Sequence, residues 1–100
     1  MQGLAWVAAG YGGAGLRPET ITEARAMAAG LVTREKAARM VAWFARHMID
    51  LEAPAARKAS PEYPSPGVVA HALWGGGSRR SSVRAQRWAS YETGRNASKA

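Results

Sequence analysis

Glycine and proline gather at a few places and divide this 100-residue chain into short segments. Four of the five prolines lie between residues 54 and 66, and three consecutive glycines occupy positions 75–77. Such clusters end regular structure, because proline lacks a backbone donor and glycine favours turns. None of the intervening segments has the strict alternation of polar and apolar residues that is typical of a strand. We therefore expect an all-α single domain of three to four short helices with irregular termini.

The segments between these breaks carry helix start and stop signals. Thr20 and Glu23 have capping-box spacing, and Gly30 stands where a left-handed residue would end that first helix. Thr33 is a candidate N-cap, and Ser65 followed by proline is another. The predicted helices, caps included, cover residues 18–30, 33–54, 65–77 and about 81–91.

Hydrophobic periodicity and glycine content suggest how these segments are organised. Residues 1–18 form an irregular Gly-rich segment, or one short helical piece over "LAWVAA". Residues 19–92 form the helical domain, and residues 93–100 form a frayed tail. The central element is "MVAWFARHMI", against which "VVAHALW" and "AQRWASY" pack.

The charge of the chain is strongly positive and unevenly distributed. Fourteen Lys and Arg residues face seven Asp and Glu, which gives a formal net charge of +7. From residue 75 onward six basic residues stand against Glu92 alone. Most of the cations are Arg, whose planar fork suits bidentate phosphate contacts. The composition favours a polyanionic partner, and the alternative is a basic tail that only aids solubility.

Several classes of chemistry lack the residues that they need. The chain has no Cys, so disulfide scaffolds, Cys-zinc sites and thiol catalysis are excluded. His47 and Asp50 lie on the same side of one predicted helix, but His71 lies on a different element and no further strong ligand is obvious, so these residues do not predict a metal site. No Ser, His or carboxylate stands in a catalytic arrangement, and "GYGGAG" at 10–15 lacks the strand and helix of a dinucleotide-binding loop. We expect a protein that is not an enzyme, holds no cofactor and has flexible coil at 10–15.

The stretch "WGGGSRR" admits two interpretations. Consecutive glycine N–H groups before a helix can form an anion-binding nest, to which Ser78, Arg79 and Arg80 would add donors. The other interpretation is a helix C-cap and a hinge between two helices, with the arginines in solvent. The two interpretations are compatible if a phosphate binds transiently at the turn.

Basic and aromatic residues recur together on two predicted helices. Arginines reach phosphates, and exposed rings stack on bases. Alternatively, Trp43 packs under the last helix or under the turn at 75–77, while its basic neighbours remain solvated. The candidate nucleic-acid-binding residues are Lys36, Arg39, Trp43, Arg46, Arg79, Arg80, Arg84 and Arg87. We expect the arginines of both helices to form one continuous cationic surface.

The stretch from Ala24 to Ser90 resembles a small module of tailed-bacteriophage proteins with the pattern RRMxxFFARH, then SPGxVAxLLWGG, then RWA. Here the pattern appears as "AARMVAWFARHMIDL", "YPSPGVVAHALWGGG" and "AQRWA". The module occurs alone or attached to head-morphogenesis proteins such as prohead proteases. Gly77 stands where the module often has Asp. The matching positions are Arg39, Met40, Phe44, Arg46, His47, Pro66, Gly67, Trp74, Gly75, Gly76 and Trp88.

The resemblance implies a phage or prophage origin and a non-catalytic helical module. Packing and helix ends account for most of the matching positions, but not for Arg46 and His47. A buried pair that ties the second helix to the backbone of Gly75 and Gly76 would explain them.

Together these observations lead to two hypotheses about function. The first is a DNA-associated phage module that contacts phosphates with little sequence specificity. The second is a virion structural or morphogenesis protein that docks on an acidic capsid or protease surface through Trp43 or Trp74; a small host-directed inhibitor is a further alternative. The N-terminus has a short apolar run without a basic region before it, so we expect no membrane partner. The expected location is the host cytoplasm or the virion.

Overall fold

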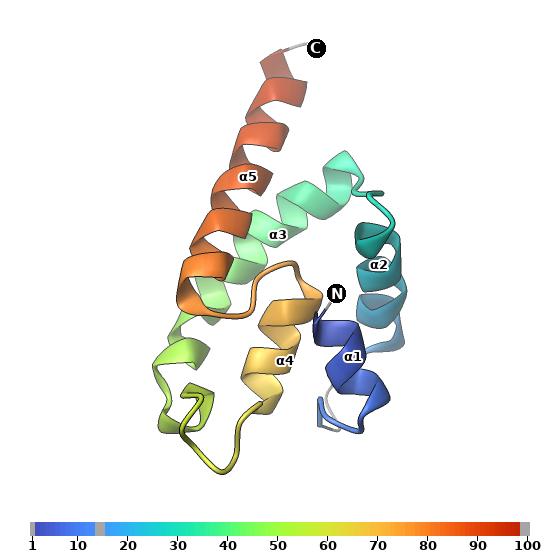
Figure 1. Ribbon diagram of the computed structural model, residues 1–100. Helices are drawn as coiled ribbons and strands as arrows, with labels where there is room; N and C mark the ends of the chain where they lie inside the picture. The colour runs from blue at the N-terminus through green and yellow to red at the C-terminus, as the bar shows by residue number, and fades with distance from the viewer. Residues whose placement is uncertain (1, 14–15, 99–100) are drawn as a thin grey trace.

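The computed structural model describes residues 2–13 and 16–98, and these residues form five α-helices and no β-strand (Figure 1). The all-α prediction is confirmed, although the structure has five helices where three to four were expected. The helices are α1 (Gln2–Ala8), α2 (Pro18–Ala28), α3 (Arg34–His47), α4 (Pro66–Leu73) and α5 (Arg79–Ser98), with two 3₁₀ turns, η1 (Met48–Glu52) and η2 (Pro54–Ala56).

Helix α1 confirms the alternative of one short helical piece within the N-terminal segment. It covers "LAWVA" and packs against α4, with Gly3 buried at the contact. A Cβ on Gly3 would lie 2.7 Å from the backbone nitrogen of Leu73. Only glycine therefore lets the two helix backbones approach this closely. Of the predicted coil at 10–15, Ala14 and Gly15 lie outside the described residues.

Helix α2 begins earlier than the predicted capping box requires. Pro18 is its first residue, and Arg17 is the N-cap without a side-chain hydrogen bond. Thr20 lies inside the first turn and its N–H donates to the Arg17 carbonyl at 3.1 Å. The fixed φ of proline suits the first position of a helix, so the helix begins at Pro18, before Thr20. The capping box between Thr20 and Glu23 therefore does not form, and that prediction is wrong. Gly30, at φ +82°, follows the helix end as predicted.

Helix α3 is capped as predicted but ends before Pro54. The Thr33 hydroxyl accepts the Lys36 N–H at 3.0 Å. At the other end, His71 Nε2 donates to the His47 carbonyl at 2.7 Å. This bond occupies an oxygen that the next helical turn would use, and the chain continues as the 3₁₀ turn η1.

Helix α5 is longer at both ends than the predicted 81–91. Ser78 accounts for the earlier start, because its hydroxyl accepts the Ser81 N–H at 3.1 Å and its carbonyl accepts the Ser82 N–H at 2.8 Å. The helix continues to Ser98, through most of the segment expected to be frayed. The last two residues of that segment lie outside the described residues.

Helix α3 is the central element, as expected (Figure 1). One side packs on α5, where Ala37, Met40 and Phe44 form a buried cluster with Ala89. Its other side faces α4 and α2. A second cluster joins α1, α2 and α4 around buried Ala24, Val69 and Leu73, and Ser65 caps α4 as predicted. The two sides of α3 thus lead to different surfaces of the molecule.

Candidate anion-binding surfaces

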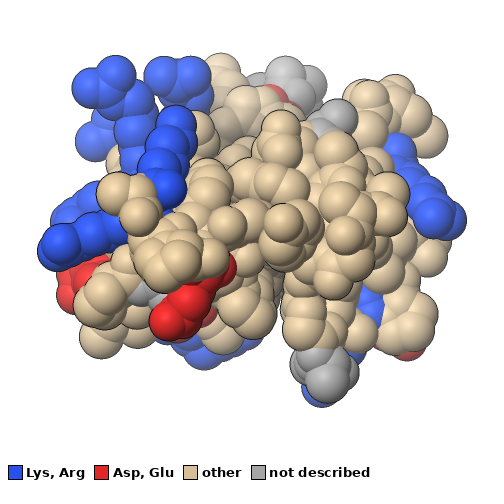
Figure 2. Space-filling view, turned by 60° about the horizontal axis from the view of Figure 1, so that its bottom comes forward, with Lys and Arg blue, Asp and Glu red and all other residues tan. Residues whose placement is uncertain are grey.

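Four predicted arginines lie together on one exposed face of α5. They surround a shallow hollow that also includes Val83. We call this set the α5 arginine face: Arg79, Arg80, Arg84 and Arg87. In Figure 2 most of the visible Lys and Arg side chains gather at one edge, and a broad uncharged area separates them from basic side chains at the opposite edge.

The α5 arginine face is hardly neutralised by carboxylates. Arg79 Nη1 lies 4.0 Å from Glu52 Oε1, and both side chains are largely exposed, which makes this a weak pair. Within residues 2–13 and 16–98, the other three arginines have no carboxylate within 4.0 Å. These guanidinium groups are free to bind an external anion.

The turn at 75–77 serves as a helix stop. Gly75 N–H donates to the Ala72 carbonyl at 3.1 Å, and Gly76 N–H donates to the His71 carbonyl at 2.8 Å. Gly77 N–H donates to Ser82 Oγ at 3.3 Å. All three N–H groups are used inside the protein, so the interpretation as a C-cap and connection is confirmed and no glycine nest is open to an anion.

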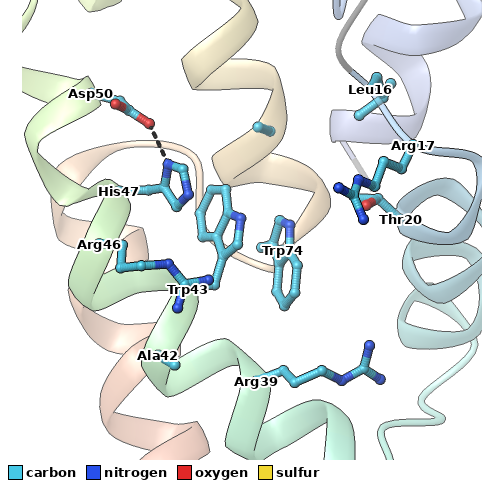
Figure 3. Close-up of a pocket in the computed structure, with 11 residues that line it drawn as sticks. Leu16, Arg17, Thr20, Arg39, Ala42, Trp43, Arg46, His47, Asp50 and Trp74 are labelled. Atoms are coloured by element: carbon cyan, nitrogen blue, oxygen red, sulfur yellow. Dashed lines mark hydrogen bonds and ion pairs between the residues drawn. The ribbon is translucent and has the colours of Figure 1, made fainter.

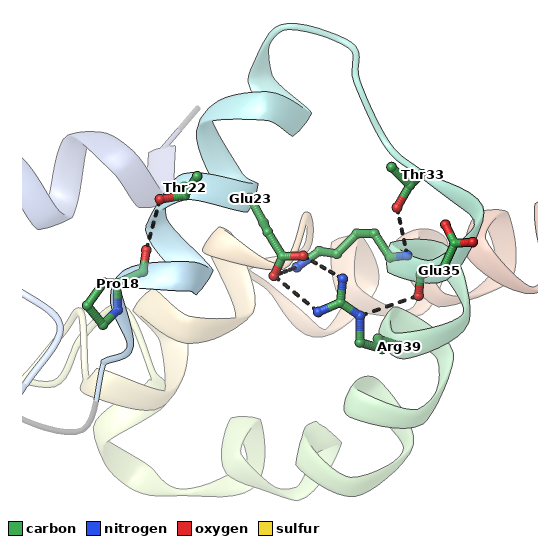
Figure 4. A network of polar contacts seen from close by, with 7 residues as sticks. Pro18, Thr22, Glu23, Thr33, Glu35 and Arg39 are labelled. Carbon is green, nitrogen blue, oxygen red and sulfur yellow. Dashed lines mark hydrogen bonds and ion pairs between the residues drawn. The ribbon is translucent and has the colours of Figure 1, made fainter.

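Lys36 is buried, contrary to its predicted place on a basic surface. Its Nζ lies 3.4 Å from the centroid of the Trp74 ring. It also lies 3.5 Å from Oε1 of Glu23, whose polar network is drawn in Figure 4. Burial lowers the pKa of Lys36 despite the nearby Glu23 carboxylate. Helix α2 covers the face of α3 that carries this lysine, so its ammonium cannot reach a nucleic acid.

Arg39 is exposed but engaged by the same carboxylate. Its Nη2 donates to Glu23 Oε2 at 2.6 Å, and its Nε donates to the Glu35 carbonyl at 3.4 Å (Figure 4). Burial raises the pKa of Glu23, but hydrogen bonding to Arg39 and the charge of Lys36 outweigh it and the pKa is lowered overall. Arg39 therefore keeps only part of its donor capacity for a ligand.

Trp43 is packed within an aromatic stack and offers no open ring face. Its ring lies parallel to that of Trp74, with centroids 5.0 Å apart, and is stacked on His47 at 4.4 Å. The edge-on His71 ring adds a contact at 4.8 Å. The alternative is correct in that Trp43 packs inside the domain. It is wrong about the surroundings, because the ring stacks on Trp74 at the end of α4 and on His47, and the neighbouring Lys36 is buried rather than solvated.

The predicted residues of α3 and α5 do not form one continuous surface. Arg39, Trp43 and Arg46 line a groove that faces α2 and α4. The α5 arginine face borders a different hollow, and no residue of α3 lines it. The face of α3 between the two sets packs on α5, so the two basic regions are separate and the expectation of a single surface is wrong.

The groove contains an arginine that sequence reasoning missed. Arg17 lies at the N-cap of α2, and Figure 3 shows it opposite Arg39 and Arg46. No spacing in the sequence links Arg17 to helix α3, because only the packing of α2 brings them together. Arg46 is exposed here and does not bond to the glycine turn, so the predicted buried pair with His47 is also wrong.

The two histidines have structural partners. His71 is fully buried; its Nε2 binds the His47 carbonyl, so its Nδ1 accepts the Ser82 hydroxyl at 2.9 Å. Burial lowers the pKa of His71 although the His47 carbonyl opposes this. His47 Nδ1 lies 3.0 Å from Asp50 Oδ2. In the part of the chain that the structure describes, no group of three or more His, Cys, Asp or Glu could hold a metal.

Comparisons with known protein families, with curated proteins and with solved structures gave no match to this chain. Among the described residues, no helix is both long enough and apolar enough to cross a membrane.

Proposed function

We propose that this protein is a non-catalytic helical module that associates with DNA through the α5 arginine face. The observation that supports this most is four exposed arginines on one helix face, of which only Arg79 has a carboxylate within 4.0 Å in the described structure. Arginines in such a row contact phosphates along a backbone. Because phosphates carry no sequence information, binding has little sequence specificity. The resemblance to a bacteriophage module makes phage DNA the expected partner.

Salt-dependent binding to labelled duplex DNA tests the proposal. Fluorescence polarisation titrations at several salt concentrations give a slope of log affinity against log salt of about −0.9 for each phosphate neutralised. Replacing all four arginines of the α5 arginine face by Ala removes up to about three to four units of that slope.

A charge-matched variant supplies the control for net charge. It removes four exposed cations outside α5 and so changes the net charge equally: Arg25→Ala, Arg34→Ala, Arg57→Ala and Lys58→Ala. This variant retains most of the binding of the native protein. Absence of binding at low salt, or an equal loss in both variants, would show that the α5 arginine face is not the DNA site.

An apolar hollow favours the docking of a protein partner as a second candidate function. It has a volume of about 630 Å³ and lies between the end of α2, α3 and α5, with Met27, Met40 and Trp88 in its walls. Trp88 is 43 % exposed, and Trp is a common interface anchor. This surface differs from the Trp43 and Trp74 surface predicted from the sequence. A pull-down from phage-infected cells with and without nuclease separates a protein contact from a nucleic-acid tether.

A further inference from the structure

The groove between the start of α2, α3 and α4 is not used by the proposed function (Figure 3). Its volume is about 610 Å³, within the roughly 300–1,000 Å³ of small-molecule sites. None of the α5 arginine face lines it, so a ligand here would be independent of DNA binding by α5.

The groove is rich in donors and positive charge. Arg17, the N-cap residue of α2, lines it together with Arg39 and Arg46 of α3 (Figure 3). Arg17 and Arg46 are exposed and have no carboxylate within 4.0 Å among the described residues. The lone carboxylate in its lining is Asp50, which already bonds to His47. Such a set of groups selects an anion and repels a cation.

The aromatic residues of the groove present their edges to a ligand. Both faces of Trp43 are covered, one by Trp74 and the other by His47. The second face of Trp74 is covered by the Lys36 ammonium. The edges of the two rings form an apolar border of the groove, held in place by the stack.

A ligand that matches this groove has a compact, highly charged anion and a flat apolar part. A phosphate monoester carries up to two negative charges and several acceptor oxygens, which suit the guanidinium groups of Arg17 and Arg46 that have no carboxylate partner; Arg39 contributes less, because it already donates to Glu23. A phosphodiester within a strand carries one charge and is attached on both sides, which hinders its entry into a recessed groove. We propose that the groove binds the phosphate monoester of a nucleotide, either free or at the end of a nucleic-acid strand.

Calorimetric titrations with matched ligands test the phosphate requirement. Adenosine 5′-monophosphate binds, whereas adenosine binds at least about tenfold more weakly because it lacks the charge-assisted hydrogen bonds. Equal binding of adenosine and its monophosphate overturns the proposal, as does the failure of every phosphorylated ligand to bind. A single-stranded oligonucleotide with a 5′-phosphate, compared with the same strand with a 5′-hydroxyl, shows whether strand ends also enter the groove.

Matched variants locate the site. Replacing Arg17 and Arg46 together by Gln weakens binding of the phosphorylated ligand at least about tenfold. Replacing the exposed Arg25 and Arg34 by Gln makes the same change in charge and leaves binding within about twofold. Equal affinity in the first variant and the native protein overturns the site, and circular dichroism confirms that both variants remain folded.

The α5 variant separates this inference from the proposed function. The protein with Ala at all four positions of the α5 arginine face retains nucleotide binding, even where it has lost duplex binding. Loss of nucleotide binding in that variant places the ligand on α5 and overturns the groove as its site.

Discussion

Lys36 is at a position where burial of a charge is costly, and two neighbours offset that cost. Its side chain is 5 % exposed, with Trp74 on one side and Glu23 on the other. Lys36 lies beside Arg39 on the basic face of this helix, and that position predicted a solvent-exposed residue. Which helix covers that stripe depends on contacts between residues far apart in the sequence, and periodicity alone does not contain this information.

Removing the carboxylate destabilises the protein more than removing the lysine. Glu23→Gln leaves the buried ammonium without a counter-ion and lowers the free energy of unfolding by about 1–3 kcal/mol. Lys36→Met keeps the packing on Trp74 and leaves Glu23 paired with Arg39, so the change is within about 1 kcal/mol. Urea unfolding followed by circular dichroism measures both. A larger loss for Lys36→Met than for Glu23→Gln contradicts this account of the cluster.

Buried His71 makes stability depend on pH. Burial lowers the pKa of His71 below 6.5, so near that pH the unfolded chain binds more protons at this site than the folded protein. The free energy of unfolding therefore falls as pH drops below about 6.5, by at most about 1.4 kcal/mol per pH unit, and levels off below the folded-state pKa.

Unfolding measured between about pH 8 and pH 5 detects this contribution. His71→Gln lowers stability at neutral pH but removes the part of the slope that His71 supplies. Ser82→Ala breaks the bond to Nδ1 and keeps the imidazole, so it destabilises the protein while the slope persists. An unchanged slope in His71→Gln contradicts the assignment.

Several helix ends were predictable because their signals are local. Thr33 and Ser65 cap α3 and α4, and Gly30 follows α2 with a positive φ. Local signals were also misread at the starts of α2 and α5, and two further features depend on distant residues. The hydrogen bond from His71 to the His47 carbonyl marks the end of α3, and the contact of Gly3 with α4 holds α1 in place. These contacts join parts of the chain that no local pattern connects.

The connection between α4 and α5 requires glycine at position 76. An added Cβ would lie 2.8 Å from Ser82 Cα and would also collide with its hydroxyl. Gly76→Ala therefore separates α4 from α5 and lowers the free energy of unfolding by about 1–3 kcal/mol. Thermal unfolding followed by circular dichroism measures the loss.

Gly94→Ala is the matched control for Gly76→Ala. Gly94 lies within α5, and a Cβ there meets no heavy atom within 4 Å in the described structure. Alanine has the higher helix propensity, so this change stabilises α5 by up to about 1 kcal/mol. Equal effects at positions 76 and 94 would show that the turn does not depend on close packing against Ser82.

At the scale of the whole molecule, the excess positive charge is divided between two surfaces. Composition correctly indicated that the last quarter of the chain carries most of it, and the structure places four of those arginines on one face of α5. Composition did not indicate that the positive charge is divided between two separate surfaces. Helix α3 directs Arg39 and Arg46 toward α2, and its opposite side packs on α5. This orientation follows from the packing of the apolar residues of α3, among them Ala37, Met40 and Phe44.

Amide chemical-shift mapping with duplex DNA at low salt shows which basic surface binds DNA, because it reports every surface in one experiment. If DNA binds to the α5 arginine face, the perturbations concentrate on residues 79–88, and the amides that border Arg25, Arg34, Arg57 and Lys58 are unchanged. Raising the salt reverses those shifts together. Perturbations spread evenly over all basic residues, or centred on the groove of Arg17 and Arg46 with α5 unaffected, would contradict the assignment of DNA binding to the α5 arginine face.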